Sequence, residues 1–330
     1  MNPLSRARLG KSELCATRLG LGGAALGGLF KDMSEENATR TVRRALELGT
    51  NLFDTAPLYG AGKSEFRLGR GLAGCDRDSY ILASKVGYSL VPEEQGSKEI
   101  YFPFENPPAL RPVVDFSYDA VMRSFEGSLQ RLGIGRIDIL HIHDPDDYFE
   151  QAMTGAYLAV AKLRREGVIG AVSLGTNRAE TVVRFVQAGD FDCCLLAGRY
   201  TLIDHAALHQ ALPLCLEKGV GIIIGGPYNS GILATGAIAG AMFNYVPADS
   251  GILEKVRQIE RICRDYSVPL KAAALQFPLG HPAVASVIPG ARSEEEVEEN
   301  FHLLNYAIPD EFWVALRKHK LLPEEAPLPM

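Results

Sequence analysis

An apolar run passes into a loop at Gly49-Thr50-Asn51-Leu52-Phe53-Asp54-Thr55-Ala56-Pro57-Leu58-Tyr59-Gly60, which puts a carboxylate and a phenol at one strand-to-loop corner. A phenol is a poor proton donor or acceptor at neutral pH unless a neighbour lowers its pKa from about 10. Two further β-like runs end in suitable neighbours, Lys85 and His143. Asp54, Tyr59, Lys85 and His143 are the set needed to move a proton while a cofactor moves a hydride.

Short β-like runs alternate with amphipathic helical patterns along the whole chain, which indicates βα units and a parallel sheet. Ser34 is a suitable N-cap for a helical pattern over 35–48, and a second pattern covers 118–132. Eight units in 330 residues match an α/β fold, the (β/α)8 TIM barrel, whose active site forms at the C-terminal ends of the strands. We expect one domain over 1–330, with an N-terminal β-hairpin over 7–15. The eight strand candidates are 17–21, 51–54, 80–84, 137–141, 169–174, 191–196, 220–224 and 284–288.

Two connections, 86–116 and 226–250, are longer than the two to six residues that usually join strands and helices. Both follow a strand candidate, so we expect both on the catalytic face, where they would form walls of a substrate pocket. We expect the pocket walls to include the aromatic and methionine side chains of these two loops, namely Tyr88, Tyr101, Phe102, Phe104, Phe116, Tyr228, Met242, Phe243 and Tyr245.

The composition excludes several classes of protein. No apolar run reaches the roughly 18 residues of a membrane span, and the N-terminus lacks the apolar core of a signal peptide. A net charge of −6 without a Lys/Arg block gives no footprint for nucleic acid or membranes. The scattered histidines predict no metal site, because the helically spaced pair His205/His209 has no third ligand. The cysteines form no C-x-x-C pair and are interpreted as buried thiols, which favours a cytoplasmic location: Cys15, Cys75, Cys193, Cys194, Cys215 and Cys263. We expect a monomer or a homo-oligomer.

Five short motifs lie at strand ends and in the last loop of the chain. They are Asp54-Thr55-Ala56-x-x-Tyr59-Gly60, Ser84-Lys85, His141-Ile142-His143, Gly175-Thr176-Asn177, and Ile288-Pro289-Gly290-Ala291-Arg292-Ser293 followed by Asn300. With these motifs the chain resembles the aldo-keto reductase superfamily over nearly its whole length. The run 195–204 and the segment 143–146 look like the branch that holds D-threo-aldose 1-dehydrogenase, L-fucose and L-galactose dehydrogenases, and pyridoxal 4-dehydrogenase.

The resemblance implies a catalytic tetrad. Tyr59 would be the general acid/base, Lys85 would lower its pKa, Asp54 would hold Lys85 charged and aimed, and His143 would donate to the substrate oxygen. His141 shares strand parity with His143, so spacing alone leaves both possible. Only the resemblance of the motif over 141–143 to that of the family selects His143, rather than His141, as the donor to the substrate oxygen.

The resemblance also implies a nicotinamide cofactor, with Thr176 and Asn177 on the carboxamide and with Gly22 and Gly23 in the strand-one turn beside it. The glutamine and the stacking tyrosine usual in the family are replaced by Ala197 and Gly225, so Pro227 or Tyr228 would have to support the ring. At the adenosine end Gly290 and Glu296 replace the cations that hold a 2′-phosphate, which favours NAD, while Arg292 leaves NADP possible. The remaining cofactor residues implied by the motif are Pro289, Ala291, Glu299 and Asn300.

The expected reaction is oxidation of an aldose, of the L-fucose, L-galactose or D-threo type, at C1 to the lactone. Asp144, Arg199 and Asn229 would bind sugar hydroxyls, with Tyr88 and Tyr228 as neighbours in the substrate site. The alternatives are a pyridoxal 4-dehydrogenase or a general aldehyde or ketone reductase and, more distantly, a non-catalytic nicotinamide-binding subunit.

Two other sequence patterns point to different dinucleotide enzymes. Gly20-Leu21-Gly22-Gly23-Ala24-Ala25 fits the Rossmann fingerprint, but that motif must open a helix directly, and the cap Ser34 comes late. Tyr59 and Lys63 have the spacing of short-chain dehydrogenases, yet two intervening glycines make a helix there unfavourable.

Overall fold

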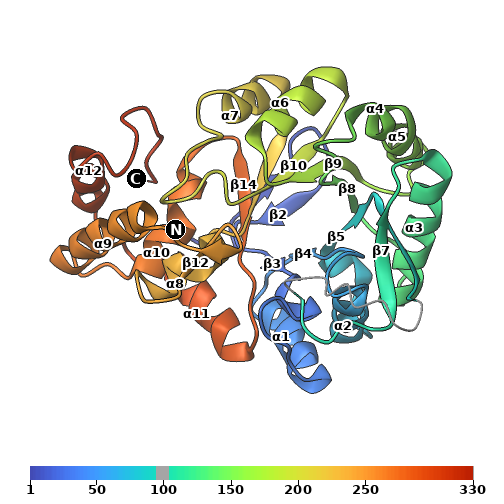
Figure 1. The fold of residues 1–330 in the computed structure, drawn as a ribbon, viewed down its shortest axis with the longest axis horizontal. Helices are drawn as coiled ribbons and strands as arrows, with labels where there is room; N and C mark the ends of the chain where they lie inside the picture. The colour runs from blue at the N-terminus through green and yellow to red at the C-terminus, as the bar shows by residue number, and fades with distance from the viewer. Residues whose placement is uncertain (94–103, 330) are drawn as a thin grey trace.

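The computed structural model describes residues 1–93 and 104–329 and contains an eight-stranded parallel barrel surrounded by helices (Figure 1). Every neighbouring pair in the barrel is parallel. Bridges Leu19–Val287 and Gly22–Gly290 join the first strand to the last, so the barrel is nearly closed and the expected TIM-barrel fold is confirmed. In order around the barrel, the strands are β3 (Leu21–Gly22), β4 (Leu52–Asp54), β5 (Ile81–Val86), β8 (Ile139–His143), β9 (Ala171–Thr176), β10 (Cys193–Ala197), β11 (Gly221–Gly225) and β14 (Val284–Ile288).

The prediction of one strand over 17–21 was wrong, because the chain changes partners within this run. Thr17 ends β2 (Cys15–Thr17), which pairs antiparallel with β1 (Arg6–Arg8) in the expected N-terminal hairpin. The Thr17 N–H donates to Asn51 Oδ1 at 2.7 Å, and the barrel strand begins only after this anchor. Leu9 and Ala16 of the hairpin region pack on the inward-facing residues that begin five barrel strands, so the hairpin covers the N-terminal end of the barrel.

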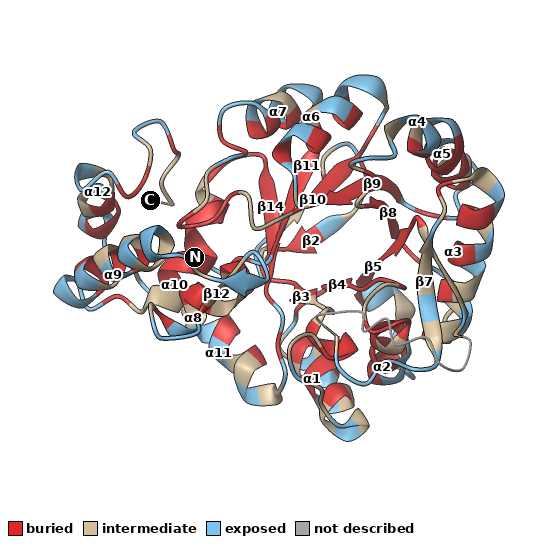
Figure 2. Ribbon diagram, in the orientation of Figure 1, coloured by how far each residue is buried: buried red, intermediate tan, exposed pale blue. Residues whose placement is uncertain are grey.

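The helices pack their apolar faces on the barrel, and Figure 2 shows buried residues on the strands and on the inner sides of the helices. Ser34 caps α1 by accepting a hydrogen bond from the Asn37 N–H at 3.2 Å, and Gly133, with φ 65°, ends α3 in the left-handed region, as predicted. The helices are α1 (Glu35–Glu47), α2 (Lys63–Leu72), α3 (Tyr118–Leu132), α4 (Phe149–Gln151), α5 (Tyr157–Arg165), α6 (Ala179–Ala188), α7 (Ala211–Lys218), α8 (Ile232–Thr235), α9 (Ser250–Asp265), α10 (Leu270–Gln276), α11 (Glu294–Leu304) and α12 (Asp310–Lys318).

The two long connections carry secondary structure of their own. The first contains an antiparallel ribbon of β6 (Tyr88–Pro92) and β7 (Leu110–Val114), and the second contains α8 and a short hairpin of β12 (Met242–Phe243) and β13 (Val246–Pro247). Phe116 is fully buried in the core, so its expected place in a pocket wall was wrong. Tyr101 and Phe102 lie outside the described residues.

Three other expectations can be compared with the structure. The cysteines are all free thiols, but Cys15 is exposed and Cys75 is half-buried, so only four of the six are buried as expected. His205 and His209 precede α7 and do not lie on a helix. In the described part of the chain, none of the helices has both the length and the apolar composition needed to cross a bilayer.

Candidate active site

Asp54 and Lys85 form a buried ion pair at the C-terminal ends of β4 and β5. Lys85 Nζ donates to Asp54 Oδ1 at 2.6 Å, to Asp54 Oδ2 at 2.7 Å and to Thr55 O at 2.8 Å, so all three ammonium protons have acceptors. Burial disfavours both charges, but at Asp54 the charges and hydrogen bonds of Lys85 and His141 together outweigh it and lower the pKa of that carboxyl. At Lys85 burial outweighs the attraction of Asp54 and lowers the pKa of the ammonium group.

Tyr59 lies in the turn that follows β4, and its ring contacts the buried pair. Lys85 Nζ is 4.9 Å from the ring centroid, and the Phe104 ring packs on the Tyr59 ring with centroids 5.9 Å apart. Burial raises the pKa of Tyr59 well above its ordinary value, and the negative charge of Asp54 adds to this rise. The positive charge of Lys85 beside the ring acts in the opposite direction, so its expected lowering of this pKa stays a prediction about one contribution, while burial sets the direction of the whole shift.

The structure separates the two histidines of β8. His141 is fully buried below the site, where Nδ1 lies 2.7 Å from Ser173 Oγ and Nε2 lies 3.3 Å from Asp54 Oδ2. His143 lines the cavity, with its ring edge-on to the Tyr59 ring at 5.9 Å between centroids. Burial lowers the pKa of His143 well below its usual range, and the positive Lys85 adds to this effect, so the imidazole is neutral. The choice of His143 as the residue facing substrate agrees with this geometry.

A cavity of about 360 Å³ opens over the tetrad at the C-terminal end of the barrel. Phe104 and Tyr245 supply its aromatic walls, which supports the expected role of both long connections. Sequence reasoning missed Ala24, Leu29 and Leu58, because small and aliphatic residues in loops carry no chemical signal. The lining residues are Ala24, Leu29, Leu58, Tyr59, Lys85, Phe104, His143, Asp144, Gly175, Thr176, Asn177, Leu195, Ala197 and Tyr245.

Of the five residues expected to bind substrate, only Asp144 lines this cavity. Tyr88 packs edge-on against the His143 ring, with centroids 5.4 Å apart, and so supports the histidine. Arg199 lines an adjoining small cavity, and its guanidinium group is engaged with Asn177 O at 2.6 Å and with Asp204 at 3.1 Å. Tyr228 lies in a second large cavity, and Asn229 lines both that cavity and the small one.

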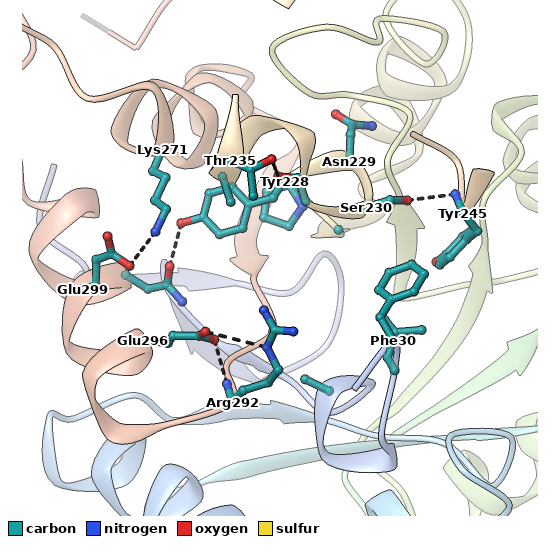
Figure 3. Close-up of a pocket in the computed structure, with 18 residues that line it drawn as sticks. Phe30, Tyr228, Asn229, Ser230, Thr235, Tyr245, Lys271, Arg292, Glu296 and Glu299 are labelled. Atoms are coloured by element: carbon teal, nitrogen blue, oxygen red, sulfur yellow. Dashed lines mark hydrogen bonds and ion pairs between the residues drawn. The ribbon is translucent and has the colours of Figure 1, made fainter. Parts of the chain in front are cut away.

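This second cavity, of about 430 Å³, adjoins the first, and both are lined by Leu29 and Tyr245. Figure 3 shows the Phe30 and Tyr245 rings near one another on the side opposite Lys271 and Glu299; their centroids are 6.1 Å apart. Its lining residues are Ala25, Leu29, Phe30, Gly226, Pro227, Tyr228, Asn229, Ser230, Gly231, Ala234, Thr235, Tyr245, Lys271, Gly290, Arg292, Glu296, Glu299 and Asn300. We call it the groove.

Polar contacts in the groove pair its charged side chains (Figure 3). Lys271 Nζ donates to Glu299 Oε2 at 2.7 Å, and Arg292 Nε lies 3.7 Å from Glu296 Oε1. The backbone N–H of Arg292 also donates to Glu296 Oε2 at 2.8 Å. Tyr228 Oη donates to Asn300 Oδ1 at 2.6 Å. Lys271 was missed by sequence reasoning because α10 is remote from the motif that marks the groove.

The expected cofactor residues divide between groove wall and supporting backbone. Pro227, Gly290, Arg292, Glu296, Glu299 and Asn300 line the groove, and Thr176 and Asn177 line the substrate cavity. Gly22, Gly23, Gly225, Pro289 and Ala291 line neither. A Cβ at Gly22 would lie 2.8 Å from Ile288 O, and one at Gly23 would lie 2.5 Å from Asp54 O, so these glycines permit close backbone packing below the groove.

Thr176 and Asn177, the residues expected to hold a nicotinamide carboxamide, both line the substrate cavity but differ in their side-chain contacts. Thr176 Oγ1 donates to Asp146 Oδ1 at 2.8 Å and accepts from the Arg178 N–H at 3.1 Å, so its hydroxyl holds the loop together. The Asn177 side chain makes no such bond within the described ranges and faces both the substrate cavity and the small one beside it. It is the better candidate to hold a carboxamide.

Known proteins are similar to this chain over nearly its whole length. Residues 18–320 match the model of the aldo/keto reductase family. The chain is 38% identical to pyridoxal 4-dehydrogenase of Microbacterium luteolum, over 95% of this chain and 97% of that protein. It is 34% identical to D-threo-aldose 1-dehydrogenase of a Pseudomonas species, over 94% and 96%. A solved aldo-keto reductase of Bacillus halodurans, in its holo form, superposes with a TM-score of 0.73 at 26% identity, over 98% of this chain and 99% of that one.

Proposed function

This chain belongs to the aldo-keto reductase family and is an oxidoreductase, and from that premise we propose that it oxidises an aldose at C1 to the lactone with NAD as hydride acceptor. One observation carries the proposal: Tyr59, Lys85 and His143 converge on a single cavity that adjoins a groove of about 430 Å³. The proposed catalytic residues are these three together with Asp54.

The proton and the hydride leave the lactol from neighbouring atoms. The C1–H bond breaks with its electron pair, and the hydroxyl proton passes to Tyr59 as the C1–O double bond forms. A nicotinamide cofactor, which Asn177 and the groove residues would hold, would supply the hydride acceptor and, in its oxidised form, a positive charge that favours the phenolate of Tyr59. In the reverse direction the raised pKa of Tyr59 keeps the phenol protonated, ready to donate to a carbonyl oxygen.

Lys85 and His143 have different tasks in this mechanism. Lys85, held by Asp54, keeps a positive charge beside the ring of Tyr59, and this charge opposes the effect of burial on the pKa of the phenol. The neutral His143 imidazole can donate one hydrogen bond to the reacting oxygen and so fix its position between phenol and cofactor.

The charges of the groove support a preference for NAD. The cations among its lining residues, Lys271 and Arg292, are each paired with a carboxylate, Glu299 and Glu296. A 2′-phosphate would therefore meet no uncompensated cation in this part of the groove, whereas a ribose hydroxyl can donate to a carboxylate. Arg292 is half exposed and can turn away from Glu296, which leaves weaker use of NADP open.

Pyridoxal is the second candidate substrate, favoured by the aromatic walls of the cavity. Tyr59, Phe104 and Tyr245 present rings on which a pyridine ring can stack, and a relative at 38% identity is a pyridoxal 4-dehydrogenase. Initial rates with L-fucose, L-galactose, D-arabinose and pyridoxal, each with NAD and with NADP, distinguish the two. The proposal predicts the highest kcat/KM for a sugar with NAD. If the enzyme turns over pyridoxal but no sugar, pyridoxal oxidation replaces aldose oxidation as the proposed function. If it turns over none of these compounds, a non-catalytic nicotinamide-binding subunit is favoured.

A further inference from the structure

Asp144 places a carboxyl group next to the residue that would hold the reacting oxygen. It follows the last residue of β8 and lines the substrate cavity. Its φ of 45° is in the left-handed region, and the backbone is held there by a 2.8 Å hydrogen bond from its N–H to Gly175 O. Backbone strain of this kind gathers at functional sites. Because Asp144 Oδ2 lies 3.7 Å from His143 Nε2, a substituent on the reacting carbon comes within reach of the carboxyl group.

The carboxyl group of Asp144 has no cation of its own. Two cations act on it, but Lys85 is bound to Asp54, and Arg178 lies 3.3 Å from Asp147. Within residues 1–93 and 104–329, no side chain or backbone group donates a hydrogen bond to this carboxyl group. Its neighbour Asp146, in contrast, accepts from the hydroxyls of two threonines. The cavity therefore contains one carboxyl group that is free to accept from a ligand.

We propose that Asp144 determines which substrates the cavity admits: it accepts a hydrogen bond from a hydroxyl or a protonated nitrogen beside the reacting carbon, and it repels substrates with a carboxylate or phosphate there. The inference rests on the proposed function, because it takes His143 as the group that holds the reacting oxygen. The substrate class is then uncharged polyols or cationic ring aldehydes, with anionic sugars and aldehydes excluded.

The charge of this selector should change near neutral pH. Burial raises the pKa of Asp144 to about 7, the negative Asp146 adds to the rise, and Lys85 and Arg178 oppose it. Repulsion of an anion therefore grows as the pH rises through this range. The neighbouring groups that face Asp144 do not change charge there: the pKa of His143 is well below its usual value, and burial raises the pKa values of Tyr59, Tyr88 and Tyr245.

Methylglyoxal and glyoxylate are suitable probes, because the reacting carbon carries an uncharged acetyl group in one and a carboxylate in the other. The experiment measures kcat/KM for the NADH-dependent reduction of each, between about pH 5.5 and 8.5, where glyoxylate stays ionised. The proteins are the wild type, Asp144→Asn and, as a control, Glu150→Gln, which removes an exposed carboxylate of α4 that faces Arg184. Asp144→Ser is a second variant should the amide fail to give folded protein.

The expected result is a methylglyoxal-to-glyoxylate ratio that rises at least about tenfold with pH in the wild type. The ratio should be low and independent of pH in Asp144→Asn or Asp144→Ser, and unchanged from the wild type in Glu150→Gln. Three results would overturn the inference and leave the proposed function standing. They are a ratio that does not change with pH in the wild type, a ratio that changes with pH in the Asp144 variants, and a failure to reduce methylglyoxal by an enzyme that turns over the sugar panel. No turnover of panel or probes overturns both.

Discussion

The substrate cavity and the groove share two wall residues but hold their charges differently. The Lys85 and Asp54 side chains are 1% and 4% exposed, whereas those of Arg292 and Glu296 are 46% and 41% exposed. Breaking a buried pair leaves an uncompensated charge without water, while an exposed pair contributes little to stability. We therefore expect substitutions in the buried pair of the cavity to disturb catalysis and stability strongly. Substitutions in the exposed pair of the groove should instead change the preference for NAD or NADP at little cost in stability.

Tyr59→Phe is expected to have the largest effect, because it removes the proton from the centre of the buried region. We expect kcat to fall about 10²- to 10⁴-fold, the scale of lost acid/base catalysis, with NAD binding nearly unchanged by fluorescence titration. Tyr200→Phe is the matched control, since it removes a buried phenol oxygen that has no partner among the described residues. A Tyr59 variant with more than half of the wild-type activity would remove Tyr59 from the mechanism.

Lys85→Met tests whether breaking the buried ion pair of the cavity strongly lowers stability. Loss of the cation leaves Asp54 charged and buried, so we expect the free energy of unfolding in urea to fall by about 3–5 kcal/mol. The double variant Asp54→Asn/Lys85→Met should recover much of this loss, because neither charge remains. In carbonyl reduction the alkaline limb of the pH profile should also move upward, since the phenol loses its cationic neighbour. An unchanged stability and pH profile would contradict both roles of the pair.

Glu296→Arg tests whether the groove is as adjustable as its exposed pairs suggest. The change removes a repulsion, releases Arg292 and adds a charge for a 2′-phosphate, so the NADP/NAD ratio of kcat/KM should rise about 10- to 100-fold. Little change in kcat is expected. Glu295→Arg, an exposed neighbour on α11 that does not line the groove, is the control. If the ratio moves less than about threefold, while Arg292→Ala abolishes NADP use, Arg292 governs the choice.

Phe104→Ala should have the smallest effect, because it changes a wall and no reacting group. Phe104 is held over Tyr59 by the neighbouring backbone, where Lys63 Nζ donates to Glu105 O at 2.7 Å and to Asn106 O at 2.9 Å. We expect the substrate KM to rise about three- to tenfold with little change in kcat, since ring contact binds substrate and transition state alike. Phe66→Ala, at an exposed aromatic residue on α2, should leave both constants unchanged.

The strand-end residues were predictable from sequence because the barrel brings strand ends together whatever the loops do. Asp54, Lys85 and His143 each lie within one residue of a strand's last position, where the alternation of apolar residues stops. The start of the first strand was not predictable, since the apolar pattern continues through Thr17 while the backbone changes from the hairpin to the barrel.

The residues that line the groove, and the ion pairs that its charged side chains form, could not be deduced from the sequence in the same way. Tyr245 and Phe30 meet across the groove from segments far apart in the chain, and nothing in either segment marks the other. Arg199 was expected to face substrate, but its charge is taken up by Asp204 and a backbone carbonyl, which no motif reveals. Lys271 reaches the groove only because α10 packs on α11.

Transfer of the C1 hydrogen of an aldose to the nicotinamide tests the central claim most directly. The measurement incubates D-arabinose carrying deuterium at C1 with NAD and the enzyme, and follows the label by mass spectrometry in the reduced cofactor and in the sugar product. The account predicts labelled NADH, an arabinonolactone without the label, and loss of both products in Tyr59→Phe. Unlabelled NADH, or a label retained in the sugar, would contradict hydride transfer from C1.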